Sequence, residues 1–182
     1  MLDTAGWALR GDVRQKAGKP LQIRFVIPSE VASSAQESQL VQQQLAAVGA
    51  QVKIEVVPSQ DFFDKYITPG DFDFTVFSWI GTPFPISSSK SIYAKPKGDN
   101  IQQNYARIGN DQIDKVFSDA TAELDPGKAR AIANQADKLI WAEVHSLTEY
   151  QRPDIKATNA KLVNYGALGF ATVKYQDIGF VK

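Results

Sequence analysis

Only one side chain in this sequence is suited to acid–base catalysis near neutral pH, and it is the single histidine, His145. A Ser-His-Asp site would need it as the general base. His145 follows an amphipathic stretch that is expected to be helical, and a positive charge suits the end of a helix. We therefore interpret His145 as a capping or packing residue and assign no catalytic residue. A small α/β hydrolase that uses His145 stays as the weakest alternative.

Four carboxylates, Asp61, Asp64, Asp71 and Asp73, lie close enough in sequence to suggest a cation site. Their spacing does not fit a calcium loop, which places ligands at alternate positions around a central glycine. Asp61 and Asp64 fall on the polar face of a short predicted helix, and Asp71 falls in a turn. We therefore expect solvated surface carboxylates and no metal site.

The sequence gives little support for a bound cofactor or for binding to nucleic acid. There is no cysteine, so thiolate nucleophiles and cysteine-ligated metals are excluded. No glycine-rich phosphate loop occurs, and we predict no cofactor. The formal net charge is zero, whereas nucleic-acid binding needs a basic surplus. The sequence thus favours a binding module over an enzyme, with no nucleic acid as partner.

The elements that position any site belong to a chain of ordinary globular composition. It has 182 residues, 43% of them hydrophobic and 22% charged, which suits one domain over residues 1–182. No apolar run approaches the ~20 residues that span a bilayer. Residues 2–7 resemble the end of a helix more than a natural beginning. We therefore expect a segment of a longer polypeptide, whose signal peptide would not be in this chain.

Apolar periodicity predicts a βαβ unit. Residues 21–27 and 52–57 are expected strands. Residues 33–48 are an expected amphipathic helix with Val41, Leu45 and Val48 on its apolar stripe, Leu40 beside them on the same stripe, and Gly49 as its cap. Short connections make the strands parallel and the crossover right-handed. The other expected elements are a loop over 8–20, a short helix over 59–67, a third strand over 72–79, a long loop over 80–108, helices over 110–122 and 126–140, and strand-like runs at 146–150, 161–163 and 172–175.

The ends of the predicted strands carry the candidate site. Ligands of open α/β sheets collect at the carboxyl ends of the strands. Pro28 and Ser29 follow the first strand, and Trp79 closes the third. If the third strand is adjacent and parallel to the others, Trp79 lies at the same edge.

Trp79 and the loop after it have the composition of half a pocket. The indole offers a flat apolar face and one N–H donor. Ile80 and Gly81 expose backbone groups, Thr82 adds a hydroxyl, and prolines 83 and 85 stiffen the loop. This suits a polar, chain-like ligand. On the residues alone, an indole packed in the core with a loop that merely turns is an equally good interpretation.

Several segments together resemble the second lobe of family 5 extracellular solute-binding proteins, the peptide-binding components of ABC importers. Each motif is weak, but their order and spacing run through most of the chain. They are Ala5-Gly6-Trp7, Gly18-Lys19-Pro20-Leu21, Gln39 to Gly49 with Val52-Lys53-Ile54, Gly70-Asp71-Phe72-Asp73 with Trp79, Asn104-Tyr105, Asn110-Asp111-Gln112-Ile113-Asp114, Asp125-Pro126 through Ile140, and Tyr150-Gln151-Arg152-Pro153.

The resemblance implies an α/β fold, one lobe of a periplasmic-binding-protein type II-like fold with a βαβ-based mixed sheet flanked by helices. Residues 1–182 would be most of the second lobe, with the first lobe of the same parent chain absent. It also implies a peptide or other small-molecule ligand and an ABC permease as partners. The parent would be extracellular or periplasmic, either membrane-anchored or secreted.

The resemblance also ranks the site residues. In peptide-binding members the Trp at the position of Trp79 lies at the ligand, and an Asp three residues later holds the peptide's α-amino group. This sequence has Thr82 there, so an altered peptide mode or a non-peptide ligand is favoured. Residues 145–149 depart from the family as well. A protein-interaction domain that uses the 80–108 loop is the other alternative. The predicted ligand-binding residues are Trp79, Ile80, Gly81, Thr82, Ser78, Phe84, Pro28 and Ser29.

Overall fold

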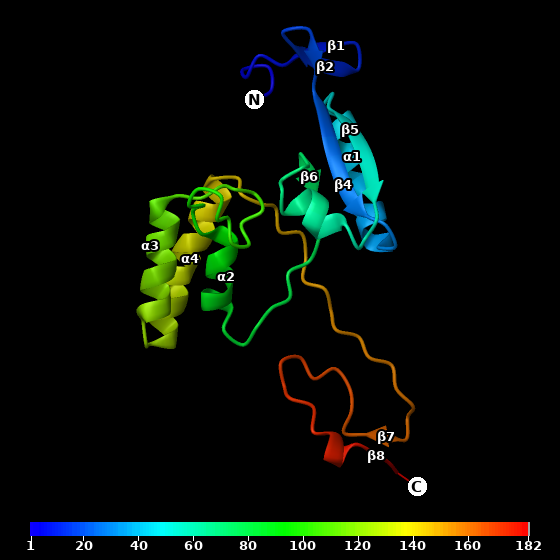
Figure 1. Ribbon diagram of the computed structural model, residues 1–182, viewed down its shortest axis with the longest axis vertical. Coiled ribbons are helices and arrows are strands. Elements are labelled where there is room, and N and C mark those ends of the chain that lie inside the picture. The colour runs from blue at the N-terminus through cyan, green and yellow to red at the C-terminus, as the bar shows by residue number, and fades with distance from the viewer. Residues whose placement is uncertain (182) are drawn as a thin grey trace. The chain divides into compact units, whose positions relative to one another are not determined.

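The computed structural model describes residues 1–181, which form two compact units that divide between Trp79 and Ile80. Each unit is described by itself. The first contains parallel strands and a helix, and the second contains a group of helices followed by an extended C-terminal segment (Figure 1). The expected α/β class is confirmed, whereas a single domain over residues 1–182 stays a prediction.

The first unit is built on a three-stranded parallel sheet. β4 (Gln22–Pro28) lies at its centre, with β5 (Gln51–Val57) on one side and β6 (Phe74–Thr75) on the other. β4 and β5 are in parallel register from Gln22↔Gln51 to Pro28↔Val57, and α1 (Ala32–Ala46) connects them. The predicted βαβ unit is therefore present (Figure 1).

α1 packs on one face of this sheet over Phe25, Ile27 and Val52, which are buried. Val41 and Leu45 contact this cluster, as their spacing predicted. The stripe continues through two buried serines, Ser34 and Ser38, while Leu40 and Val48 are exposed. The predicted inclusion of those two residues was wrong. Residues 34, 38, 41 and 45 follow the helical repeat, and the small serines let the helix lie close to the strands.

The other face of the sheet is covered by the segment that follows β5. Its single π-helical turn, η1 (Phe62–Ile67), buries Phe62 and Ile67 completely. Val26 and Val57, which alternate to this face, are buried too. The short helix expected over residues 59–67 is thus confirmed in part. It spans only residues 62–67 and forms a π-helical turn, which is wider than an α-helical turn.

Residues 8–20 are not the predicted loop but a small antiparallel sheet of β1 (Ala8–Arg10), β2 (Val13–Lys16) and β3 (Lys19–Pro20). Ala17 and Gly18 both have positive φ between β2 and β3, as a two-residue hairpin turn requires. Polar residues line these short exposed strands, so the alternation that reveals a strand is missing. Arg14 joins the hairpin to the end of α1, because its amide donates to the Gly49 carbonyl at 2.7 Å.

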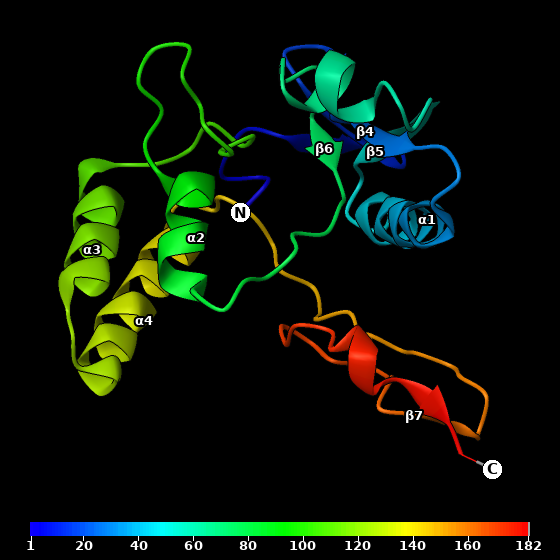
Figure 2. The same ribbon diagram turned by 60° about the horizontal axis from the view of Figure 1, so that its bottom comes forward.

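Three helices lie side by side in the second unit: α2 (Pro85–Tyr93), α3 (Asp111–Ala122) and α4 (Pro126–Ala142) (Figure 2). The last two were predicted, and a side chain caps the start of each: Asn110 accepts from two amides and Asp125 from one. α2 corrects the expectation of a structureless loop over 80–108. Serines dominate α2 and conceal its two apolar contacts, Ile86 and Tyr93, which pack on the core.

The core of these helices consists of buried residues from α3 and α4. They are Ile113, Val116, Phe117, Ala136 and Ile140. The spacing in α3 matches the predicted stripe. No described helix, within residues 1–181, has both the length and the apolar character needed to cross a membrane.

The C-terminal segment holds one short antiparallel pair, β7 (Leu162–Val163) with β8 (Gly179–Phe180), and a 3₁₀ turn, η2 (Tyr175–Asp177). The strand-like run at 161–163 is thereby confirmed in part. The strands predicted at 146–150 and 172–175 were wrong. Both runs have suitable residues, but neither finds a partner strand among the described residues.

Candidate functional site

The three parallel strands bring their carboxyl ends to one edge of the sheet. β4 and β5 end opposite each other at Pro28 and Val57, and β6 runs parallel to β4 from the pair Phe25↔Phe74. The condition under which Trp79 shares this edge, an adjacent and parallel third strand, is met. The strand itself is shorter than predicted. It ends at Thr75, so Trp79 lies four residues beyond the last ladder pair.

Serines tie the ends of β4 and β5 together. The Ser29 amide donates to the Val57 carbonyl at 2.7 Å, and the Ser59 amide donates to the Ser29 hydroxyl at 3.2 Å. The Ser59 hydroxyl in turn donates to the Ser29 carbonyl. Pro28 is buried and Ser29 is half-buried. Ser59 follows the end of β5, so parallel strands bring it to this edge, although it is not among the predicted ligand-binding residues.

Trp79 is held by other aromatic rings but is not buried. Its indole meets Phe77 edge to face with 5.3 Å between centroids, and Phe77 meets Phe63 in the same way, also at 5.3 Å. Trp79 nevertheless stays 43% exposed within a unit whose core residues are almost inaccessible. An indole that packs on a neighbouring ring and keeps this much exposed surface can serve as a stacking platform.

Arg24 binds the segment before Trp79 to the central strand. Its side chain donates to the Asp71 carboxylate at 2.8 Å and to the Asp71 carbonyl, and it forms an ion pair with Glu55 at 2.8 Å. Its backbone amide donates to the Asp73 carboxylate at 2.7 Å. Asp71 and Asp73 are exposed, as expected of surface carboxylates, but both are also bound by Arg24. The hydrogen bond from Arg24 holds the pKa of Asp71 below its usual range.

In the second unit, the hydroxyl of Thr82 is used to shape its own loop. It accepts a hydrogen bond from the Phe84 amide at 3.1 Å and donates one to the Ser88 hydroxyl at 3.0 Å. A hydroxyl has one donor and two acceptor positions. Thr82 therefore keeps one acceptor position for a ligand and no donor.

The residues around Thr82 differ in how much they offer to a ligand. Ile80 is 92% exposed and Phe84 73% exposed, so both apolar side chains are accessible. Gly81 lies against Phe170: a Cβ added to Gly81 would come 3.1 Å from the ring. The glycine thus lets the Phe170 ring of the same unit approach closely, while a close approach by a ligand stays a prediction.

His145 packs between a buried amide and an aromatic ring. Its Nε2 lies 2.9 Å from Oδ1 of Asn104, and its ring meets Tyr93 with centroids 4.8 Å apart. The Asn104 amide donates to the carbonyls of Ala94 and Ile108, so its Oδ1 is the acceptor and Nε2 carries the proton. Burial lowers the pKa of His145, with a partial offset from the Ile92 backbone. These contacts describe a neutral packing residue rather than a general base.

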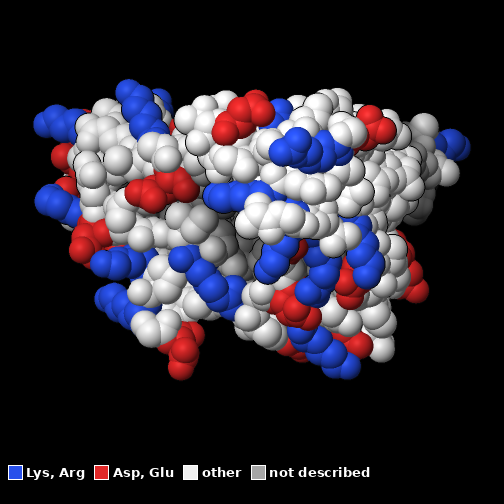
Figure 3. Space-filling model, turned by 90° about the horizontal axis from the view of Figure 1, so that it is seen from above, with Lys and Arg blue, Asp and Glu red and all other residues white. Residues whose placement is uncertain are grey.

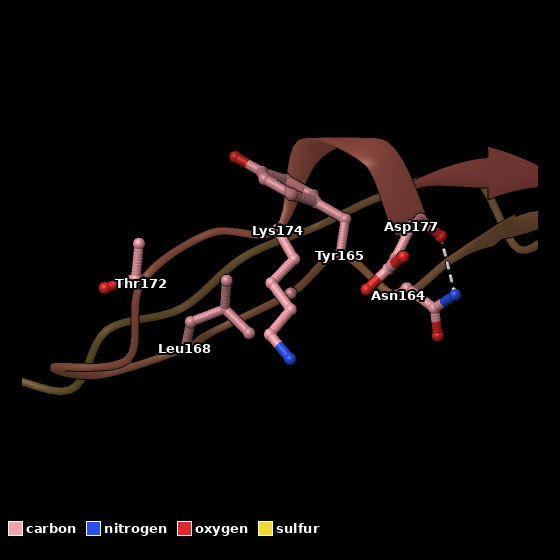
Figure 4. Close-up of a pocket in the computed structure, with 7 residues that line it drawn as sticks. Asn164, Tyr165, Leu168, Thr172, Lys174 and Asp177 are labelled. Atoms are coloured by element: carbon pink, nitrogen blue, oxygen red, sulfur yellow. Dashed lines mark hydrogen bonds between the residues drawn. The ribbon is translucent and has the colours of Figure 1, made fainter.

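The two surface depressions are lined by other residues than the predicted site residues. One of about 650 Å³ is formed by the C-terminal segment, where Tyr165, Leu168 and Lys174 line an open depression and Asn164 donates to the Asp177 carbonyl (Figure 4). Another lies at the opposite, amino-terminal end of β4 and β5, beside Gln22 and Gln51. Neither contains a predicted site residue. Within residues 1–181, no group of histidine and carboxylate side chains could hold a metal ion.

Charge does not mark a binding surface. Lysine and arginine are interspersed with aspartate and glutamate on the face shown in Figure 3. The candidate residues are themselves uncharged, from Pro28 and Ser29 to Trp79 and Thr82. The arrangement can therefore offer stacking, apolar contact and neutral hydrogen bonds to a ligand.

Comparison with known proteins places this geometry in a family. The family model for bacterial extracellular solute-binding proteins, family 5 Middle, matches residues 1–101, which is more than half of the chain. The oligopeptide-binding proteins OppA of Mycobacterium tuberculosis and Mycobacterium bovis are 41% identical over 181 residues. The match covers all of this chain and 30% of each relative, so the chain spans about a third of their length.

Solved structures agree. The oligopeptide-binding protein AppA from Bacillus subtilis, in complex with a nonapeptide, matches with a TM-score of 0.69 and 23% identity over 79% of this chain and 29% of that one. NikA from Brucella suis, in complex with Fe(III)-EDTA, matches with a TM-score of 0.62 and 25% identity, covering 78% of this chain and 29% of NikA. The expected periplasmic-binding-protein type II-like fold is confirmed. The chain belongs to the family 5 bacterial extracellular solute-binding proteins, a family of binding proteins rather than enzymes.

Proposed function

We propose that this chain is most of the second lobe of a two-lobed protein that captures a peptide or another small polar solute outside the cell and delivers it to an ABC permease. The observation that carries the proposal is Trp79, half exposed beyond the carboxyl edge of a parallel sheet, in a chain of the solute-binding family. The first lobe of the parent supplies the second face of the ligand site. The parent is extracellular or periplasmic, membrane-anchored or secreted.

The proposed ligand contacts centre on Trp79, with the indole as a stacking surface. Ile80, Phe84 and the backbone at Gly81 add apolar area and hydrogen-bonding groups, and Ser78, Pro28 and Ser29 lie at the periphery. Of these, Ser78 is exposed, whereas Pro28 is already covered by the strand packing.

Thr82 sets the ligand class within this proposal. Related peptide binders use an Asp three residues after the Trp to hold the peptide's amino group, and a charge-assisted hydrogen bond contributes about 1.5–3 kcal/mol. Thr82 has one neutral acceptor position left, because its other hydrogen-bonding positions serve Phe84 and Ser88. The site therefore accepts ligands whose amino end is blocked, distant or absent almost as well as those with a free one.

The test is calorimetry on the complete parent polypeptide, with a set of peptides offered both with free and with N-acetylated amino ends. Trp79→Ala should weaken binding by more than about 30-fold, as loss of a buried aromatic anchor does. Trp141→Ala, which removes an equally exposed indole from α4, is the matched control and should leave affinity unchanged. Equal effects of the two substitutions would refute the role of Trp79.

A second substitution tests the ligand class. Thr82→Asp keeps an acceptor for the Phe84 amide, since aspartate supports the same kind of turn. It should favour free over acetylated peptides by about tenfold or more, because the new carboxylate pairs with the ammonium. The 182-residue chain alone should bind weakly, since lobe closure buries the ligand's other face. Tight binding by the isolated chain would contradict the two-lobed proposal.

The exposed side chains of Ile80 and Phe84 also favour one rival, an interaction domain that uses residues 80–108 to bind a protein. This rival predicts that Trp79 fluorescence responds to no solute and shifts with a protein partner. A solute-dependent shift in the parent polypeptide would exclude it.

A further inference from the structure

The segment that carries Trp79 has very little strand pairing to fix its position. Only Phe74 and Thr75 pair with β4, and the next four residues lead to Trp79 without a ladder. Two pairs give the register little support from backbone hydrogen bonds, and slippage by one residue would move every side chain of the strand to the opposite face. Something else has to hold residues 71–79 against the central strand.

Arg24 supplies that hold from the middle of β4. Its backbone exchanges hydrogen bonds with Asp73: the Arg24 amide donates to the carboxylate at 2.7 Å, and the Asp73 amide donates to the Arg24 carbonyl at 3.2 Å. Its guanidinium reaches Asp71 at 2.8 Å. These contacts fix the chain one and three residues before β6 begins.

The guanidinium is itself fixed from the other side. Glu55 of β5 lies 2.8 Å from its Nε, so Arg24 of β4 joins β5 to the segment that precedes β6. It is only about one-third exposed, and a planar fork held by two carboxylates has little freedom to rotate. Arg24 therefore holds a fixed position against which residues 71–79 are placed.

The aromatic contacts show what depends on this register. Phe77 meets Phe63, and Trp79 meets Phe77, so the place of the indole depends on where these residues stand along the segment. A slip by one residue would turn both rings away from Phe63. The indole would then lose the edge contact that orients its open face.

We propose that Arg24 is a positioning residue for ligand binding: through Asp71 and Asp73 it sets the register of residues 71–79 and hence the orientation of Trp79. The inference rests on the proposed function in so far as Trp79 meets the ligand. Arg24 itself touches no ligand.

The experiment compares Arg24→Met, Arg24→Lys and Asp71→Asn in the complete parent polypeptide. Trp7 and Trp141 are replaced by Phe, together with any tryptophan in the remainder of the parent, so that emission reports Trp79 alone. The readouts are the emission maximum, acrylamide quenching and calorimetric affinity for a peptide that the wild type binds. Val52→Ala is the matched control, because it destabilises the same sheet from β5, the strand on the far side of β4 from β6.

Arg24→Met should shift Trp79 emission and weaken peptide binding on the order of tenfold. Arg24→Lys should recover part of both, because a lysine keeps the charge but cannot pair with Asp71 and Glu55 at once. Val52→Ala should change neither signal. Asp71→Asn keeps the side chain's size and tests the same contact if Arg24→Met does not fold.

The outcomes separate this inference from the proposed function. Unchanged emission and affinity in Arg24→Met and Asp71→Asn would overturn the positioning role, as would an equal loss in Val52→Ala. If the wild type binds no solute, the proposed function fails. The emission and quenching data then still decide whether Arg24 places Trp79.

Discussion

Asn104 is the side chain whose loss should cost the second unit most. It is fully buried and makes three hydrogen bonds: its amide donates to the carbonyls of Ala94 and Ile108 at 2.8 and 2.7 Å, and its Oδ1 accepts from His145 at 2.9 Å. Through these contacts it joins the residue after α2, the end of the segment before α3 and the third residue after α4. We expect Asn104→Ala to destabilise the unit severely.

The magnitude follows from what the substitution leaves unpaired. Each buried polar group that loses its only partner costs about 1–3 kcal/mol, and Asn104→Ala orphans up to three of them. Ala94 is fully enclosed, whereas Ile108 and His145 are half-buried, so water can satisfy part of the latter two. A loss of about 3–5 kcal/mol in the free energy of unfolding is the result. This is a large part of the 5–15 kcal/mol typical of a whole domain.

Urea denaturation of the 182-residue chain, followed by far-ultraviolet circular dichroism, measures the loss as a shift in midpoint at constant slope. Gln103→Ala is the neighbouring control, since Gln103 is exposed and should change stability by less than about 0.5 kcal/mol. A double-mutant cycle with His145→Ala isolates one of the three hydrogen bonds and should give a coupling of about 1 kcal/mol.

Two results would refute the reasoning. If Asn104→Ala costs less than about 1 kcal/mol, the three hydrogen bonds are not the reason for this buried amide. If the cycle shows no coupling between Asn104 and His145, the tautomer assigned to the histidine is wrong, because a ring with its proton on Nδ1 would not donate to Asn104.

Three further outcomes follow from the same structure. Gly49→Ala should lower the free energy of unfolding by roughly 1–3 kcal/mol, because φ is +84° and a Cβ would lie 2.8 Å from the Leu9 side chain. Gly11→Ala is the control and should cost less in the same thermal melts, because the space around Gly11 is open. Asn110→Ala should cost about 1–2 kcal/mol by chemical denaturation, since two amides at the start of α3 lose their acceptor. Burial lowers the pKa of His145, so the unfolded chain binds its proton first and stability should fall as pH drops below about 6.5. A melting temperature that is flat from pH 7 to pH 5, or a slope that survives His145→Gln, would contradict this.

The parts of the fold that could be predicted are those whose apolar residues repeat. β4, β5, α1, α3 and α4 each carry such a repeat, and the caps Asn110 and Asp125 mark where two helices begin. The hairpins over residues 8–20 could not be predicted in this way, because short strands lined by polar residues show no alternation. α2 could not be predicted for a similar reason. Its serines have low helix propensity, and only Ile86 and Tyr93 reach the core.

The candidate site, like the fold, could be predicted only in part. The shared edge of the strands, and Trp79 near it, followed from the βαβ pattern and simple chain direction. The role of Arg24 did not, because it depends on which carboxylates a strand pairing brings into reach, and Asp71 is 47 residues away in sequence. A guanidinium within a half-buried strand was the signal available, since a charge in that place needs partners.

The charges nearest to Trp79 are thus used inside the protein. Arg24 satisfies Asp71, Asp73 and Glu55 together, and the segment from Phe74 to Thr82 that follows carries no charge at all. Structural ion pairs fix the position of the segment, while the surface left for recognition is aromatic, apolar and neutral. Such a surface gains contact area from many side-chain types and discriminates weakly among them, because discrimination needs unmatched charges or unpaired polar groups in the wrong ligand. Under the proposed function, the ion pairs of Arg24 therefore set the position of the segment that carries Trp79, and ligand choice is left to shape and stacking.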